Sequence, residues 1–262
     1  MSKFRFQAHR GDSKYFPENT LTSLGAAVEQ GYDIIEIDTK FTKDNVCVLL
    51  HDASVNRTGR RPDGSVISEE KLPVSKLTLE EVKGYDFGLF MGEQFRGTQI
   101  PTLAEALAFL KGKGVQVKLD NVYQGFNEEQ FEIFCSVIEE ADMEENICFT
   151  CKTLPYFRYL AERFPRAEMH FDGSLTPAAL AECEKMSKYR RVTVWIPYDN
   201  AKTAWFVGRK ADAEFCRELH QYGDVGIWLI GTKEELKVSK EDFGADVIET
   251  NGELKPHMLA EI

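Results

Sequence analysis

The chain has 262 residues, of which 43 are acidic and 32 basic, and its formal net charge is −11. This length can bury a large core in one α/β domain, and the acidic balance argues against a surface that binds nucleic acid or anionic lipid. The first residues contain no apolar signal core and no later segment approaches a membrane span, which predicts a cytoplasmic protein without stable membrane insertion.

Apolar segments with strand-like composition recur along the chain, and amphipathic segments of helical periodicity separate them. The predicted strands cover residues 4–9, 33–38, 115–120, 147–151, 167–172, 191–196, 225–230 and 247–250. The predicted helices cover residues 20–30, 103–113, 128–141, 154–164, 177–187, 212–222 and 233–237. Eight such units predict a (β/α)₈ TIM barrel, formed by residues 1–262 as a single catalytic domain.

Residues 52–102 interrupt this alternation with glycine, proline and charge. Because the stretch contains little core-forming sequence, we expect a small insertion after the second strand, an excursion or lid, and not a second domain.

Just before this insertion, residues 46–52 form another apolar run. Only seven residues separate this run from residues 33–38, too few for a parallel crossover, so the two runs are predicted to form an antiparallel hairpin that turns at residues 43–45.

Strand parity predicts which side chains face the barrel interior. One parity of each predicted strand is largely apolar, whereas the other carries polar and ionisable groups. Because active sites of TIM barrels lie at the carboxyl ends of the strands, these groups predict a polar active-site mouth. The inward parity includes Arg5, Gln7, His9, Glu36, Asp38, Gln116, Lys118, Asp120, Thr150, Glu168, His170, Asp172, Thr193, Trp195, Trp228, Glu249 and Asn251.

Glu36 and Asp38 share one face of an apolar strand, where two carboxylates repel each other and lose hydration. A divalent cation is the simplest compensation, and hard oxygen ligands suit Ca²⁺ or Mg²⁺. The hairpin returns His51 towards this pair. His9 ends the first strand and is followed by Arg10, a bidentate donor suited to a phosphate or a carboxylate.

The sequence allows two roles for each of three further residues. Asn19 is either the N-cap of the following helix or a substrate contact. Asp52 either orients the imidazole of the preceding histidine or caps a turn. His170 is either an extra ligand or a structural histidine, and we favour the structural role.

Seven motifs resemble, in order and spacing, those of the glycerophosphodiester phosphodiesterase family. They are His9-Arg10-Gly11, Pro17-Glu18-Asn19-Thr20, Glu36-Ile37-Asp38, Thr42-Lys43-Asp44, His51-Asp52, Arg57-Thr58 and Ile100-Pro101-Thr102-Leu103. The match is dense over residues 6–110 and looser beyond, where Trp228 and residues 244–250 resemble the late motifs of the family.

The resemblance implies a metal-dependent enzyme on a (β/α)₈ barrel that hydrolyses glycerophosphodiesters to glycerol 3-phosphate and an alcohol. It implies that Glu36 and Asp38 bind Ca²⁺ or Mg²⁺. His9 and His51 would serve as general acid and base, which agrees with two imidazoles placed on either side of one phosphate. Arg10 would bind the phosphate.

One departure from the family pattern concerns the third strand. The family has a carboxylate, one residue and a lysine, of which the carboxylate is the third metal ligand and the lysine contacts phosphate. This chain has Lys118-Leu119-Asp120 instead. We expect Asp120 to act as the metal ligand and Lys118 to lie deeper, paired with Glu168 or Glu249, because an unpaired buried lysine is costly. The alternative is that Lys118 replaces the cation and weakens metal affinity and activity.

The predicted partner is therefore a small-molecule phosphodiester, with Arg10, Lys118 and Trp228 as candidate substrate contacts. Two alternative functions remain open. One is a related phosphodiesterase that acts on a lysophospholipid or sugar phosphodiester, including through a cyclic phosphate. The other is a non-catalytic phosphodiester binder, which the exchange of Lys118 and Asp120 would permit. The oligomeric state is not predicted.

Overall fold

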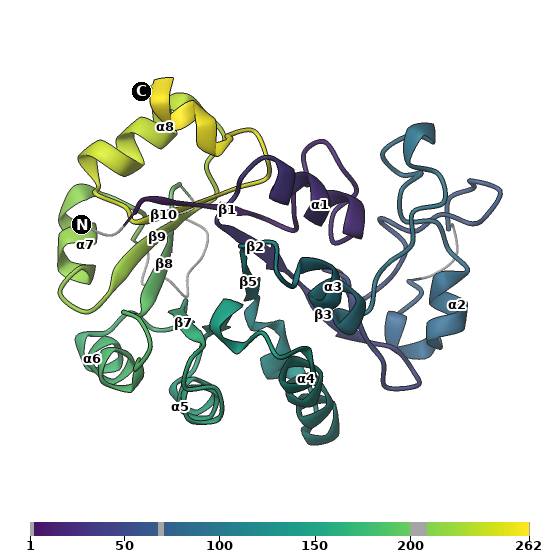
Figure 1. Cartoon of the computed structure of the whole chain (residues 1–262), viewed down its shortest axis with the longest axis horizontal. Coiled ribbons are helices and arrows are strands. Elements are labelled where there is room, and N and C mark those ends of the chain that lie inside the picture. Colours follow the sequence, from purple (N-terminus) through teal and green to yellow (C-terminus); the bar gives the residue numbers. More distant parts are fainter. Residues whose placement is uncertain (1–2, 68–70, 200–208, 262) are drawn as a thin grey trace.

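The computed structural model describes residues 3–67, 71–199 and 209–261. Its centre is a closed barrel of parallel strands, with helices around the outside (Figure 1). In order around the barrel, the strands are β1 (Arg5–Ala8), β10 (Val247–Thr250), β9 (Asp224–Trp228), β8 (Thr193–Pro197), β7 (Glu168–Phe171), β6 (Ile147–Cys151), β5 (Gln116–Leu119) and β2 (Ile34–Ile37). The predicted (β/α)₈ barrel and its eight strands are confirmed.

Each predicted helix is present, and the excursion adds one more. The helices are α1 (Leu21–Glu29), α2 (Leu79–Lys83), α3 (Leu103–Leu110), α4 (Glu128–Ala141), α5 (Leu154–Arg163), α6 (Pro177–Met186), α7 (Ala213–Leu219) and α8 (Lys233–Lys237). Side-chain caps define several starts: the Thr20 side chain accepts a hydrogen bond from the Ser23 amide at the start of α1. Asn19 is therefore not the N-cap, and that interpretation was wrong. None of the helices in the described ranges has the length and apolar character of a membrane span.

The two parities of the barrel strands face different environments. The apolar parity packs against the helices, and Phe6, Ile35 and Val117 are fully buried in this outer core. The opposite parity faces the barrel interior. Ile34 is apolar on that parity because it packs inside the barrel with Trp195, in a small interior cluster.

The predicted hairpin forms, but with a different partner strand. β4 (Cys47–Leu49) pairs antiparallel with β3 (Thr39–Phe41) and not with residues 33–38. β2 lies inside the closed barrel, where β1 takes one edge and β5 the other, so it has no edge to offer. The chain turns between Thr42 and Val46, and the hairpin still carries His51 back to the end of β2, where the Leu50 amide donates to the Asp38 carbonyl.

The described parts of the excursion, residues 52–67 and 71–102, lie beside the barrel, next to α1 and α3 (Figure 1). The expectation that this stretch contains little core-forming sequence was wrong. Val55, Val82 and Phe87 are buried in a second apolar cluster separate from the barrel core. These residues are scattered among glycine, proline and charge, so periodicity did not identify them. A lid function remains a prediction.

Candidate active site

A cavity of about 290 Å³ lies at the C-terminal ends of the barrel strands and is called the mouth below. The main candidates of the sequence analysis line it, namely His9, Arg10, Glu36, Asp38, His51, Lys118, Asp120 and Trp228. Asn19, Asp52 and His170 are not among the lining residues. The lining residues are His9, Arg10, Glu36, Asp38, His51, Lys118, Asp120, Asn121, Lys152, Asp172, Trp195, Trp228 and Glu249. Parity had placed Asp172, Trp195 and Glu249 inside the barrel, with Glu249 as a candidate counterion of Lys118. Asn121 and Lys152 were missed because each follows the end of a strand, where the two-residue periodicity stops.

Three carboxylates converge in the mouth. Oxygens of Glu36, Asp38 and Asp120 all lie within 4.8 Å of one another. The register of β2 against β5 produces this cluster, because the amide of Asp120 donates to the Ile37 carbonyl at 3.1 Å and so brings Asp120 level with Asp38. Burial, followed by repulsion from Asp38 and Asp120, raises the pKa of Glu36 well above its usual range. Close, mutually repelling hard oxygen donors fit a divalent cation such as Ca²⁺ or Mg²⁺.

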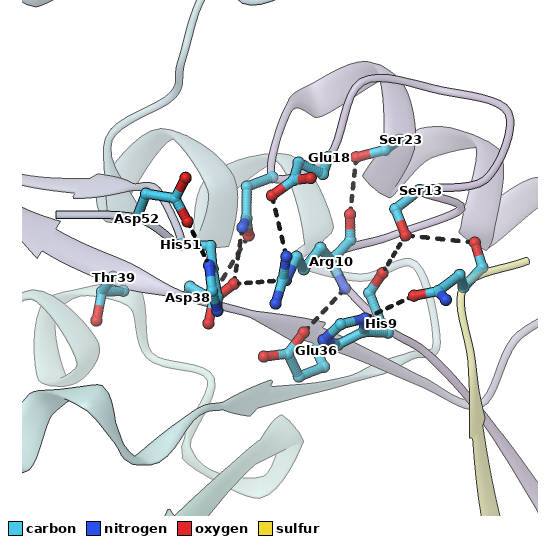
Figure 2. Close-up of polar contacts among 12 residues, drawn as sticks. His9, Arg10, Ser13, Glu18, Ser23, Glu36, Asp38, Thr39, His51 and Asp52 are labelled. Carbon is cyan, nitrogen blue, oxygen red and sulfur yellow. Dashed lines mark hydrogen bonds and ion pairs between the residues drawn. The ribbon is translucent and has the colours of Figure 1, made fainter. Parts of the chain in front are cut away.

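A tight turn after β1 aims Arg10 at these carboxylates. Arg10 and Gly11 both have positive φ angles, 59° and 77°. A Cβ on Gly11 would lie 2.6 Å from a backbone atom of α1, so only glycine fits there. The Arg10 amide donates to Glu36 Oε2 at 2.8 Å, and its guanidinium lies between Asp38, at 3.0 Å, and Glu18, at 3.2 Å (Figure 2).

Asn19, the former cap candidate, supports the same cluster. Its Nδ2 donates to Asp38 Oδ2 at 2.9 Å, and its Oδ1 accepts from the Asp38 amide at 3.2 Å. The residue adopts a positive φ of 56°, which orients the side chain towards β2 and away from the helix start. Asn19 therefore positions one of the carboxylates.

Each candidate catalytic histidine has one ring nitrogen held by a neighbour. His9 Nδ1 lies 2.7 Å from Asn251 Oδ1, so it donates a proton there and leaves Nε2 with a lone pair. His51 Nδ1 lies 2.7 Å from Asp52 Oδ1 (Figure 2). Although partial burial opposes it, hydrogen bonds from Arg57 and His51 lower the pKa of Asp52 to about 2. This contact favours the orienting role of Asp52.

Lys118 is level with Glu36 in the β2–β5 register and lies one step deeper in the barrel than Asp38 and Asp120. Its Nζ is 3.6 Å from Glu249 Oε1 and 4.1 Å from the centre of the Trp195 ring. Burial lowers the pKa of Lys118, but Glu249 and Glu36 outweigh this effect and raise it. The ammonium is thus held by a carboxylate and an aromatic face, and Glu249, one of the two expected counterions, is the one that it contacts.

His170 supports Lys118 through Trp195. Trp195 Nε1 donates to His170 Nδ1 at 2.9 Å, so His170 Nε2 carries the proton and donates to Glu168 Oε1 at 3.0 Å. Burial lowers the pKa of His170 to about 4, so the ring is neutral. Both nitrogens are used, as expected of a structural histidine. Cys148, Glu168 and His170 lie close enough to hold a metal. However, His170 Nδ1 accepts a hydrogen bond from Trp195 and Nε2 donates one to Glu168, so neither ring nitrogen offers a free lone pair.

The other end of the barrel, called the floor below, is formed by Arg5, Gln116, Glu168 and Thr193. Arg5 donates to both oxygens of Glu168, at 2.7 and 2.9 Å, and Gln116 Nε2 donates to the same carboxylate at 2.9 Å. The expectation that the inward polar groups gather at the mouth was therefore wrong for these residues. They occupy the first positions of their strands and meet at the N-terminal end.

The model of the glycerophosphoryl diester phosphodiesterase family matches residues 9–225. The chain belongs to this family. The match begins at His9 and includes the three clustered carboxylates, both candidate catalytic histidines, Arg10 and Lys118. Trp228 and Glu249, which also line the mouth, lie beyond the end of the match.

Relatives in the glycerophosphoryl diester phosphodiesterase family are similar over part of their length. A glycerophosphodiester phosphodiesterase of Caldanaerobacter subterraneus is 37% identical over 145 residues, which cover 53% of this chain and 54% of that protein. Glycerophosphodiester phosphodiesterase 1 of Rattus norvegicus is 38% identical over 102 residues, 38% of this chain and 28% of that protein. The alignments with these two relatives thus span about half of their length or less.

Solved structures share the fold along nearly the whole chain. A putative glycerophosphoryl diester phosphodiesterase of Silicibacter pomeroyi has a TM-score of 0.77 at 18% identity, with 95% of this chain and 90% of that chain covered. A phosphodiesterase of Oleispira antarctica, solved in complex with the product sn-glycerol-3-phosphate, has a TM-score of 0.70 at 21% identity, with 95% and 93% covered. At these identities the likeness establishes the barrel architecture.

Proposed function

We propose that the protein is a metal-dependent phosphodiesterase that hydrolyses glycerophosphodiesters to glycerol 3-phosphate and an alcohol. The observation that carries this proposal is the convergence in one cavity of three carboxylates within 4.8 Å, an arginine and two histidines. Membership of the family and the names of its relatives support the same activity. The net charge of −11 favours a small diester over a polyanionic substrate. We place the reaction in the cytoplasm.

In this proposal Glu36, Asp38 and Asp120 hold a Ca²⁺ or Mg²⁺ ion. A divalent cation bound there supplies positive charge that stabilises the developing charge on the phosphoryl oxygens. Arg10 binds the phosphate from the side of β1, because its guanidinium already lies beside Asp38 at 3.0 Å. Trp228 provides an aromatic contact for the organic part of the substrate.

The two histidines divide the proton transfers. The free Nε2 lone pair of His9 accepts a proton from the attacking water, whose oxygen bonds to phosphorus. The bond from phosphorus to the leaving oxygen breaks, and His51 donates a proton to the resulting alkoxide. Asp52 orients the imidazole of His51, because its carboxylate accepts a hydrogen bond from Nδ1 at 2.7 Å.

The first test measures release of glycerol 3-phosphate from glycerophosphoethanolamine by metal-stripped protein, with Ca²⁺ or Mg²⁺ then added back. We expect the metal-stripped protein to be inactive, and we expect Ca²⁺ or Mg²⁺ to restore turnover. Absence of turnover with both metals would reject the proposed reaction on this substrate. It would also shift support to another phosphodiester or to a non-catalytic binder.

A metal titration tests the assignment of Asp120. We expect the substitution Asp120→Asn to weaken affinity for the cation, because it removes one of three charged ligands. Asp142→Asn is the matched control, since the Asp142 side chain is 89% exposed and far from the mouth in sequence. Unchanged affinity in Asp120→Asn would contradict the assignment and favour Lys118 as a built-in cation, a role that its position beside Glu36 in the β2–β5 register would allow.

A further inference from the structure

One carboxylate of the mouth has no part in the proposed chemistry. Asp172 follows β7, two strands beyond β5 around the barrel. The residue is only 8% exposed and lines the cavity. Its Oδ2 accepts a hydrogen bond from Asn121 Nδ2 at 2.5 Å, whereas its Oδ1 is enclosed and has no hydrogen-bond partner among the described residues.

A buried carboxylate oxygen without a donor has lost its hydration without compensation, and such atoms in native proteins need an explanation such as a bound water or ligand. The contact with Asn121 keeps the Asp172 side chain at the wall of the cavity. Burial, with repulsion from Asp120 added, raises the pKa of Asp172 to about 7, although Lys118, Lys152 and Asn121 oppose this shift.

The location of Asp172 indicates what it would bind. Asn121 contacts Asp172 directly and is the residue after Asp120, so Asp172 lies one side-chain contact from the proposed metal ligands. Asp172 and these ligands line the same cavity of about 290 Å³, so a short arm attached to a phosphate held there can reach Asp172. The arm must carry a hydrogen-bond donor, because the available group is a carboxylate oxygen.

Charge distinguishes between the possible donors. Lys118 and Lys152 are both near enough to favour the ionised form of Asp172, and both line the same cavity. Two ammonium groups disfavour a cationic headgroup at this position, and Asp172 itself repels a second phosphate. A hydroxyl group is neutral, donates to the carboxylate and accepts from an ammonium or amide, so it suits both kinds of neighbour.

We propose that Asp172, positioned by Asn121, is a specificity residue that accepts a hydrogen bond from a hydroxyl group on the glyceryl arm of the substrate. The proposal rests on the proposed function, because it assumes that the phosphate binds at the Glu36, Asp38 and Asp120 cluster. It adds a recognition element for the polyol part of the diester on the side of the barrel opposite Arg10.

Binding of two phosphate monoesters to Ca²⁺-loaded protein tests the proposal without turnover. Glycerol 3-phosphate carries the hydroxyl groups and methyl phosphate lacks them. By titration calorimetry, we expect the wild type to bind glycerol 3-phosphate about tenfold more tightly, the ratio that corresponds to 1.4 kcal/mol. Asp172→Asn, which keeps the size of the side chain but removes its charge, should lose this preference and keep its affinity for methyl phosphate.

Asp142→Asn is the control for loss of one surface charge, and a thermal melt shows whether each variant folds. If Asp172→Asn does not fold, Asn121→Ala provides the second test: it releases Asp172 and should reduce the preference by a smaller factor. A wild type without preference, a variant that retains it, or a variant that loses both ligands equally would overturn the proposal.

Turnover separates this proposal from the proposed function. Bis(p-nitrophenyl) phosphate has no hydroxyl groups, so Asp172→Asn should raise the KM for glycerophosphoethanolamine about tenfold more than the KM for bis(p-nitrophenyl) phosphate. If the wild type prefers glycerol 3-phosphate but releases none from a diester, the proposed function fails and the binding site stands. If the wild type turns over the diester normally and Asp172→Asn leaves KM unchanged, the proposed function stands and the binding role of Asp172 fails.

Discussion

The two ends of the barrel hold their buried charges in opposite ways. At the floor, Glu168 is surrounded by donors, and although burial opposes it, hydrogen bonds from His170 and Arg5 hold its pKa well below the usual range. At the mouth, burial and repulsion by Asp38 raise the pKa values of Glu36 and Asp120. The floor therefore satisfies its carboxylate with protein groups, whereas the mouth keeps mutually repelling carboxylates that fit the proposed cation.

The size of each hollow does not distinguish the two ends. The floor opens into a hollow of about 680 Å³, larger than the 290 Å³ of the mouth. Its cations already have carboxylate partners: Lys3 lies 2.6 Å from Asp33, and Arg191 lies 3.4 Å from Asp224. We therefore assign binding to the end where charge is unbalanced and a structural role to the end where charge is paired.

The largest expected effect comes from removing a proton donor at the mouth. His51→Gln should reduce turnover of glycerophosphoethanolamine by about 10²–10⁴-fold, the usual contribution of one general acid or base. The melting temperature should change little, because the His51 side chain is 41% exposed. His257→Gln, at an exposed position of the C-terminal segment, is the control. Wild-type turnover in His51→Gln would contradict the assignment of His51 as the proton donor.

Breaking the charge pair at the floor should instead reduce stability. Glu168→Gln leaves Arg5 partly buried without its counterion, and loss of one partner of a buried pair lowers the free energy of unfolding by about 3–5 kcal/mol. Urea denaturation measures the change, and the exposed Glu162→Gln on α5 is the control. Equal effects of the two substitutions would show that the floor does not stabilise the barrel. Turnover of the folded fraction should be retained.

The pH dependence of stability sharpens the same contrast. His170 has a pKa of about 4 in the folded protein, below the usual 6.5, so the unfolded chain binds its proton first as the pH falls. Stability should therefore decrease between pH 6.5 and 4, by roughly 3 kcal/mol from this group. His170→Gln should flatten that part of the curve, measured as urea midpoints at several pH values.

His220 provides a control of opposite sign for this pH experiment. Its hydrogen bond to Asp246, at 3.0 Å, raises the pKa of His220 above 6.5. The stability that this pair contributes is present below pH 6.5 and is lost as the pH rises through the folded pKa. His220→Gln should therefore alter the curve above pH 6.5. A wild-type slope below pH 6.5 in His170→Gln would contradict the neutral state of His170.

The sequence by itself determined the barrel and the candidate site residues. Alternation of strand and helix patterns is local, and residues two apart on a strand share a face, so Glu36 and Asp38 were placed together without tertiary information. The same periodicity placed Asp120 on the inward face of its strand, whereas its position beside Asp38 followed from the β2–β5 register. Motif spacing identified His9 and His51, because the motifs that contain them resemble those of the glycerophosphodiester phosphodiesterase family.

Only the tertiary structure decided which side chains meet. Parity predicts that Arg5, Lys118 and Glu168 point inwards, but it does not predict how far along the barrel axis each lies. The register between strands that are distant in sequence pairs Arg5 with Glu168 and Lys118 with Glu249. In the closed barrel, β2 likewise pairs with β1 and β5, so it cannot pair with the hairpin strand. Local periodicity encodes the face of a strand, whereas contact partners depend on how distant strands align, and that alignment is a property of the assembled barrel.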